Sequence, residues 1–176
     1  INNGNLTWTT PTFTGTNIIT NKGQLNVPNL IISNLTFYQN GLLNMLDNSI
    51  TIDNGGTLEI QNSLLKLTTL IIKSRGILTH SANSGTQIYT LNITAINLTI
   101  ESGGSIDITG KGYSGSNGYG AGGDCSCARD GGGGGAGYGG KGGGLSGREG
   151  AVYGSLTQPV NLGSGGGNGP YGYQGG

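Results

Sequence analysis

The stretch Leu98-Thr-Ile-Glu-Ser-Gly-Gly104-Ser-Ile-Asp-Ile108 alternates apolar and polar residues, breaks at a pair of glycines and then resumes the alternation. Alternation with a period of two places one set of side chains on each face of a β-strand, so the apolar residues can share a buried side. The glycine four residues after the central isoleucine marks a bend, where we expect a positive φ that glycine adopts without steric cost. The stretch therefore predicts a strand, a tight bend and a second strand.

The same pattern occurs four more times upstream, over residues 17–27, 35–45, 50–60 and 70–80. The recurrent glycines, at positions 23, 41, 56, 76 and 104, are separated by 18, 15, 20 and 28 residues. This spacing is too long for repeated two-residue hairpins and too irregular for a hexapeptide coil. It suits a parallel β-helix, whose coils stack on one another while loops of variable length project outward. We predict an all-β protein with about five irregular coils, all in one register.

Stacking in that single register predicts which polar side chains face outward. Asp53, Lys73 and Glu101 would form a ladder of alternating charge. The next position along each coil would add a second outward ladder of small polar residues, made of Asn21, Gln39, Asn54, Ser74 and Ser102. His80 falls at an inward position, and the chain has no second histidine with which it could bind a metal.

The composition excludes several classes of function. Of the 176 residues 39 are glycine, only 9% are charged, and the net charge is zero. The few basic residues are dispersed, which argues against nucleic-acid binding, and no apolar run approaches the ~20 residues of a membrane span. The sequence begins without methionine or a signal peptide, so we expect a processed or truncated piece of a longer protein.

We expect three parts along the chain. Residues 1–16 form an N-terminal cap or an inter-subunit strand, because the end strands of a solenoid are unpaired edges. Leu6 and Trp8 are the inter-subunit candidates, since this segment could pair with the end of a neighbouring subunit and build a fibre. Residues 17–110 form the coils, and residues 111–176 form a segment rich in glycine and tyrosine.

The glycine- and tyrosine-rich segment is expected to be ordered. Glycine accounts for 29 of the 67 residues from 110 to 176, and six of the eight tyrosines lie there. Tyrosine rings can pack against glycine backbone, so we predict extended polyglycine strands folded back on the β-helix, with further strand pairing near 151–162. The tyrosines offered as surface-binding candidates are Tyr113, Tyr119, Tyr138, Tyr171 and Tyr173.

Two kinds of covalent modification have candidate residues. The Asn-x-Thr sequons give four glycosylation candidates, Asn5, Asn34, Asn92 and Asn97, about as many as chance would produce in so Asn- and Thr-rich a chain. Cys125 and Cys127 are the only cysteines and are the disulfide candidates. They could close a small strained ring, pair with other chains, stay reduced as a reactive pair, or supply half of a shared metal site. Four ligands for zinc are absent, so we predict no metal and no cofactor.

Paired carboxylates are the remaining candidates for a catalytic site. Asp53, Glu59, Glu101 and Asp107 project from the coils on the non-core side, and Glu59 and Asp107 share one register position. Thr79 of the intervening coil would keep the two carboxylates roughly 10 Å apart. That distance suits an inverting glycosidase only loosely, and neither residue has an evident basic partner. We therefore predict no catalytic residues.

The coils resemble those of right-handed parallel β-helix surface proteins. Segments 106–113, 135–143 and 153–167 are similar to the glycine-rich modules of very large secreted or surface-anchored proteins, except that Tyr138 stands where such modules often have histidine. The resemblance implies a right-handed β-helix and an extracellular or cell-surface location. The leading hypothesis is a non-enzymatic fibre subunit or surface stalk that self-associates through the β-helix ends. The alternatives are an adhesin that binds glycans or another repetitive surface such as ice, and, third, a polysaccharide-cleaving enzyme.

Overall fold

The computed structural model describes residues 1–7, 12–14, 18–61, 65–125, 132–144 and 148–169. The chain divides into two compact units. The first, called the solenoid below, consists of Ile1–Ser81 and Tyr89–Ile108. The second, called the glycine unit, consists of Ala82–Ile88 and Thr109–Gly176.

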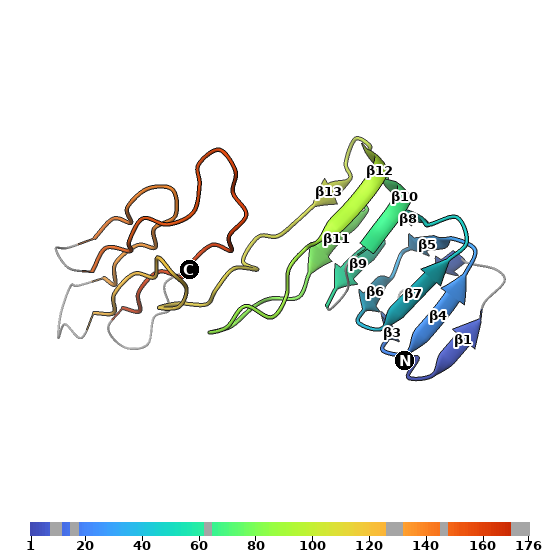
Figure 1. The fold of residues 1–176 in the computed structure, drawn as a ribbon, viewed down its shortest axis with the longest axis horizontal. Coiled ribbons are helices and arrows are strands. Elements are labelled where there is room, and N and C mark those ends of the chain that lie inside the picture. The colour runs from blue at the N-terminus through green and yellow to red at the C-terminus, as the bar shows by residue number, and fades with distance from the viewer. Residues whose placement is uncertain (8–11, 15–17, 62–64, 126–131, 145–147, 170–176) are drawn as a thin grey trace. The chain divides into compact units, whose positions relative to one another are not determined.

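Every regular element of the solenoid is a β-strand, and the described residues contain no helix. The strands are short, and most have three to five residues (Figure 1). In chain order they are β1 (Asn5–Thr7), β2 (Thr12–Thr14), β3 (Ile18–Asn21), β4 (Gln24–Val27), β5 (Leu30–Ser33), β6 (Thr36–Gln39), β7 (Leu42–Met45), β8 (Ser49–Asp53), β9 (Thr57–Ile60), β10 (Leu65–Ile72), β11 (Ile77–His80), β12 (Ile93–Ile100) and β13 (Ser105–Ile106).

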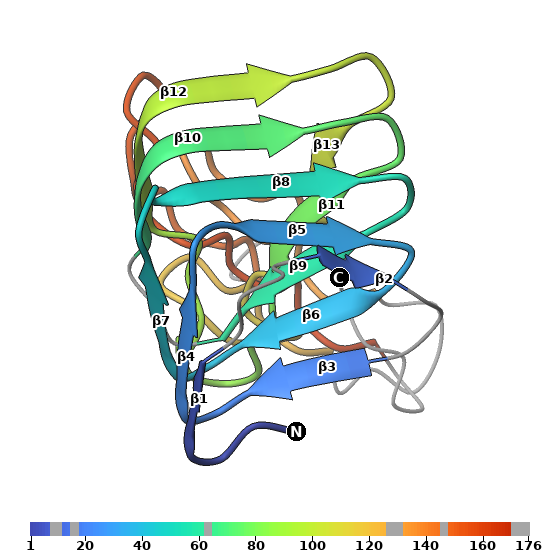
Figure 2. The ribbon, with the colours of Figure 1, turned by 90° about the vertical axis from the view of Figure 1, so that its right-hand side faces the viewer.

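The strands form three parallel sheets, in the orders β12-β10-β8-β5-β2, β13-β11-β9-β6-β3 and β1-β4-β7. Each strand pairs in parallel with the strand one coil away. In Figure 2, β5, β8, β10 and β12 run from left to right on the near side, each above the last, so the coil is right-handed. The predicted all-β, right-handed parallel β-helix is confirmed.

The number of turns is smaller than predicted. The sheet β1-β4-β7 has three strands whereas the other two sheets have five, so only the first three coils have three sides. In the last two coils the eight-residue strands β10 and β12 curve around one corner (Figure 2). The solenoid therefore makes about three complete turns rather than five.

The five repeat copies do not share one register, and that prediction is wrong. Gly23 and Gly41 lie at the corners that follow β3 and β6, whereas Gly56, Gly76 and Gly104 lie at the corners that follow β8, β10 and β12. The two groups belong to different edges of the triangular coil. Both corners join short alternating strands through a glycine, so the local pattern is the same although the place in the coil differs.

The reason for the recurrent glycine also differs from the prediction. None of the five glycines has a positive φ; at the second group of corners Asn54, Arg75 and Gly103 have it instead. A Cβ atom on Gly41 would overlap the carbonyl oxygen of Gly23, its equivalent one coil earlier. Glycine is needed here because consecutive coils approach each other too closely for a side chain.

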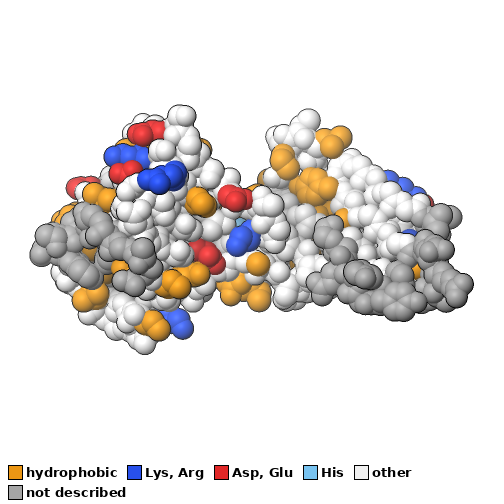
Figure 3. All heavy atoms as spheres, turned by 180° about the vertical axis from the view of Figure 1, so that it is seen from behind, with side chains coloured by type: hydrophobic (Ala, Val, Ile, Leu, Met, Phe, Trp, Pro, Cys, Tyr) orange, Lys and Arg blue, Asp and Glu red, His pale blue; other side chains and the backbone are white. Residues whose placement is uncertain are grey.

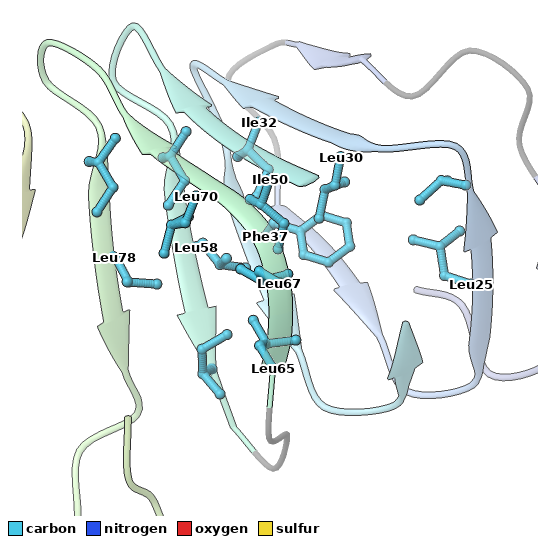
Figure 4. Packing of buried hydrophobic residues seen from close by; sticks show 14 of the residues in the cluster. Leu25, Leu30, Ile32, Phe37, Ile50, Leu58, Leu65, Leu67, Leu70 and Leu78 are labelled. Atoms are coloured by element: carbon cyan, nitrogen blue, oxygen red, sulfur yellow. The ribbon is translucent and has the colours of Figure 1, made fainter. Parts of the chain in front are cut away.

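The solenoid core consists of stacked aliphatic side chains. Figure 4 shows these residues pointing toward one another inside the coil. Ile32, Ile52 and Ile72 occupy the same position in successive coils, and none exposes any surface. Phe37, also fully buried, fills the space between the sheets. Alternation places these apolar residues inside, because every second residue of a strand faces the same side.

The predicted outward ladder that includes Asn21 and Gln39 is wrong, because both side chains are buried inside the coil. Asn2 Nδ2 donates to Asn21 Oδ1 at 2.9 Å, and Asn21 Nδ2 donates to Gln39 Oε1 at 3.2 Å. Gln39 Nε2 donates in turn to the carbonyl oxygen of Gly41 at 2.7 Å. Buried polar groups require such partners, and stacking supplies them from one coil to the next. His80 is also buried, and its Nδ1 lies 2.8 Å from the Ser81 carbonyl oxygen.

The glycine unit is built from extended segments without regular strands in the described residues, so the strand pairing predicted near 151–162 is wrong. Segment 120–125 shows how its chains associate. The N–H groups of Gly122 and Cys125 donate to segment 163–168, at Gly165 and Asn168. The N–H group of Gly123, between them, donates to the Arg148 carbonyl oxygen at 2.7 Å.

The carbonyl groups of the same segment point to a third neighbour. Gly120 and Gly123, three residues apart, accept from Gly137 and Gly134 at 2.8 and 2.9 Å. A pleated strand has a period of two and bonds on two sides only. Partners that repeat every three residues and lie on three sides fit an extended helix with three residues per turn, the geometry of polyproline II. We call segments 120–125, 132–138, 148–153 and 163–168 the glycine bundle.

Close backbone packing explains why the glycine bundle is so rich in glycine. A Cβ on Gly122 would overlap the carbonyl oxygen of Gly134, and one on Gly134 would overlap that of Arg148. Collagen meets the same constraint at its axis, where only glycine fits. In the glycine unit the backbone therefore takes the place of a side-chain core.

Candidate binding surfaces

The last coil of the solenoid exposes side chains that the preceding coil buries in the same register. Leu98 pairs with Leu70, and their exposed fractions are 53% and 1%. Ile106 pairs with Leu78, with 40% and 1% exposed. An open hollow at this end is lined by inward-facing residues that include Leu98 and Ile106. Within the described residues of the solenoid, no further coil covers this cross-section of the core at the C-terminal end.

The first coil is uncovered in the same way. Leu6 of β1 pairs with Leu25 of β4, and their exposed fractions are 38% and 2%. A hollow at this end is lined by Leu6, Ile19 and Leu25, together with Ile1, Asn2, Asn21 and Phe37. The N-terminal segment is itself a coil, since β1 and β2 pair in register with β4 and β5. Leu6 therefore lies where an inter-subunit residue would be needed, and Trp8 lies outside the described residues.

The carboxylates considered for catalysis are dispersed over the coils. Asp53 Oδ2 accepts a hydrogen bond from Lys73 Nζ at 3.4 Å, as the charge ladder predicted. Glu59 lies opposite Thr79 of β11, and Asp107 lies on the far side of that strand. With strands about 4.8 Å apart, the Glu59 and Asp107 backbones are roughly 10 Å apart. No three metal-ligating side chains come together within the described part of the chain.

All four predicted glycosylation sites are accessible. Asn5, Asn34, Asn92 and Asn97 are exposed. Asn34 lies in the turn after β5 with φ of 55°, and Asn97 faces outward from β12. Exposure satisfies one requirement for modification, and occupancy stays a prediction.

Cys125 is buried at the end of segment 120–125 and is disulfide-bonded. Cys127 lies outside the described residues, so the predicted pairing of the two cysteines stays a prediction. The preceding residue, Asp124, links three segments by hydrogen bonds. Its Oδ1 accepts one from the Ser116 hydroxyl and one from the Asn168 N–H, the latter at 2.7 Å. These hydrogen bonds, that of Ser116 first, lower the pKa of Asp124 from its ordinary value.

Three tyrosine rings form a cluster on the glycine bundle. Tyr138 and Tyr153 meet edge to face with centroids 4.8 Å apart, and Tyr119 lies 6.0 Å from Tyr153. The Tyr153 ring lies over Gly120, where a Cβ would collide with it. Of the predicted binding tyrosines, Tyr119 and Tyr138 are thus brought together and Tyr113 is half-buried apart from this cluster. Tyr171 and Tyr173 lie outside the described residues.

The loop 151–162 exposes apolar side chains that are not among the predicted binding residues. Val152, Leu156 and Val160 are 59%, 80% and 88% exposed. Leu156 lies over Gly139, which has no side chain to displace it. Figure 3 shows hydrophobic side chains gathered at one edge of the glycine unit. The sequence signal for this loop is the apolar stretch 151–162 inside a glycine tract, which predicts a strand but forms an exposed loop.

No family model matches the chain, and no curated protein or solved structure matches it significantly. The class of protein is therefore defined by the fold alone, as a parallel β-solenoid joined to a glycine unit. Among the described residues no helix is long and apolar enough to cross a membrane.

Proposed function

We propose that the protein is a non-enzymatic structural module of an extracellular or cell-surface fibre or stalk, and that copies stack through their solenoid ends. The main support for this proposal is the difference in exposed fraction between residues that occupy the same register position in an end coil and in the neighbouring inner coil. Leu98 and Leu6 expose 53% and 38% of their surface, where Leu70 and Leu25 expose 1% and 2%. Burying apolar surface contributes about 25 cal/mol per Å², so another coil on either end would be favourable.

The partner at each end is a second copy of the chain. The edge strands β12 and β13 at one end belong to the same two sheets as β2 and β3 at the other. Stacking the N-terminal coil of one copy on the C-terminal coil of the next would extend both sheets in parallel. Such a contact joins two different surfaces, and repeated head-to-tail contacts of this kind build open filaments.

Charge placed on one exposed core position tests this arrangement. Leu98→Asp puts a carboxylate into the apolar centre of the proposed interface, where an unpaired buried charge is costly. Ile96→Asp is the matched control, because Ile96 lies on the same strand and is 79% exposed at a corner outside the core register. We expect sedimentation and electron microscopy to show oligomers or filaments for the natural chain and Ile96→Asp, and monomers for Leu98→Asp.

Mixing two variants tests the direction of stacking. Leu6→Lys blocks the N-terminal end and leaves the C-terminal end intact, whereas Leu98→Asp does the reverse. Head-to-tail stacking predicts that each variant alone is monomeric and that the mixture forms one-to-one dimers. Dimers of Leu98→Asp alone would indicate head-to-head contact, and a monomeric natural chain at high concentration would overturn the proposal.

A further inference from the structure

We propose that the tyrosine cluster and the 151–162 loop of the glycine unit form a binding site for neutral saccharides. The site is independent of the solenoid ends, because every residue in it belongs to the glycine unit. Three features of the site support this assignment: the rings are rigidly held, the loop is ordered, and charged side chains are absent from its sequence.

The rings are held in place by the glycine bundle. The Tyr153 hydroxyl donates to the Leu162 carbonyl oxygen at 2.5 Å, and the Tyr138 hydroxyl accepts from the Asn161 N–H at 3.2 Å. Both hydroxyls therefore fix the base of the loop. Tyr119 packs against Tyr153 and leaves 74% of its own surface exposed. An exposed aromatic surface on a fixed support loses little conformational entropy when a ligand stacks on it.

The loop is ordered by its own hydrogen bonds. The Ser155 hydroxyl oxygen accepts from the N–H groups of Thr157 and Gln158 at 3.3 and 3.1 Å. Gly154 starts this turn with φ of 67°. The turn holds Leu156 and Val160 outward, so a compact, ordered loop displays apolar side chains beside the rings. Exposed apolar side chains that an ordered loop holds together are typical of interaction sites.

The absence of charged residues from the segments that form the site indicates an uncharged ligand. Segments 112–123, 132–140 and 150–169, which supply the three rings and the loop, contain no Asp, Glu, Lys or Arg. Besides Tyr153, the polar side chains of the loop are neutral hydroxyls and amides, those of Ser155, Thr157, Gln158 and Asn161. Ligand sites combine apolar and aromatic walls with a few polar groups. A neutral saccharide matches both, because its C–H face stacks on tyrosine while its hydroxyls pair with neutral donors and acceptors.

A glycan array containing neutral and charged oligosaccharides tests the site. The full chain carrying Leu98→Asp is used as the background, so that stacking through the solenoid ends cannot add avidity. We expect binding to a subset of neutral glycans, with Tyr119→Ala at least about tenfold weaker. Tyr119→Phe keeps the ring and should retain binding, and Tyr38→Ala, on the outward face of β6, should have no effect.

Thermal unfolding of each variant shows whether the glycine unit stays folded. Binding only to charged glycans, or binding that Tyr119→Ala leaves unchanged, would overturn the proposal. The same holds if the folded chain binds no neutral glycan or binds neutral phosphatidylcholine vesicles instead. None of these outcomes bears on stacking, which is measured separately by the oligomeric state of the natural chain.

Discussion

The solenoid and the glycine unit become compact in opposite ways. The solenoid buries side chains: Phe37, Ile52 and Ile72 expose none of their surface, and the backbone lies around them. The glycine unit buries backbone: Gly122 and Gly134 lie against carbonyl oxygens of neighbouring segments at distances that exclude a Cβ. In the first unit the hydrophobic effect is the main stabilising term. In the second, satisfied backbone hydrogen bonds and close contact replace it.

The comparison also shows where each unit tolerates change. A side-chain core is damaged by removing atoms, since the cavity that remains adds to the lost transfer free energy. A backbone core is damaged by adding atoms, since there is no space for them. Two pairs of substitutions test this difference, and a third prediction concerns the acid stability of the glycine unit; the largest expected effect comes first.

Phe37→Ala should destabilise the solenoid most, by about 3–5 kcal/mol, because it removes a fully buried ring from the space between the sheets. Tyr38→Ala, one residue further along β6 and facing outward, should change stability by less than about 0.5 kcal/mol. Denaturant unfolding of the two variants gives both values. Equal losses would mean that the coil is held by its backbone ladders rather than by its core.

Gly134→Ala should destabilise the glycine unit by about 1–3 kcal/mol, through the overlap of one added methyl group with the Arg148 carbonyl oxygen. Gly140→Ala is the control, because the space around Gly140 is open and its φ is not positive. Hydrogen exchange should show faster exchange across the glycine bundle for Gly134→Ala, with the solenoid amides unchanged. If the amides of the glycine bundle are equally protected from exchange in both variants, close backbone packing is not what requires glycine at position 134.

The smallest effect concerns acid stability of the glycine unit. Hydrogen bonds from Ser116 and Asn168 lower the pKa of Asp124 below its ordinary 3.8. A carboxyl whose pKa is lower in the folded state stabilises that state above the unfolded pKa. This contribution is lost as the pH falls through the folded value. Melting curves between pH 7 and pH 3 should therefore show a smaller acid-induced loss for Asp124→Asn than for the natural chain, and parallel curves would contradict this role.

The sequence predicted the solenoid because its signal is local. Period-two alternation and a glycine at each bend are visible within eleven residues such as 98–108, and they are enough to predict parallel coils. The same locality caused the errors. Two corners of one coil carry the same short pattern, so Gly41 and Gly56 looked equivalent although they lie on different edges of the triangle.

Local sequence patterns are sufficient to predict that the chain is all-β, that its coils stack in parallel, and that glycine dominates a separate segment. The inward orientation of Asn21 and Gln39 depends on the folded coils, because their mutual hydrogen bond needs two coils stacked in register. The backbone hydrogen-bond partner of each glycine in the glycine bundle also depends on the tertiary structure. Glycine has no side chain to distinguish one residue from the next, so partner choice there depends on how whole segments fit together rather than on residue type.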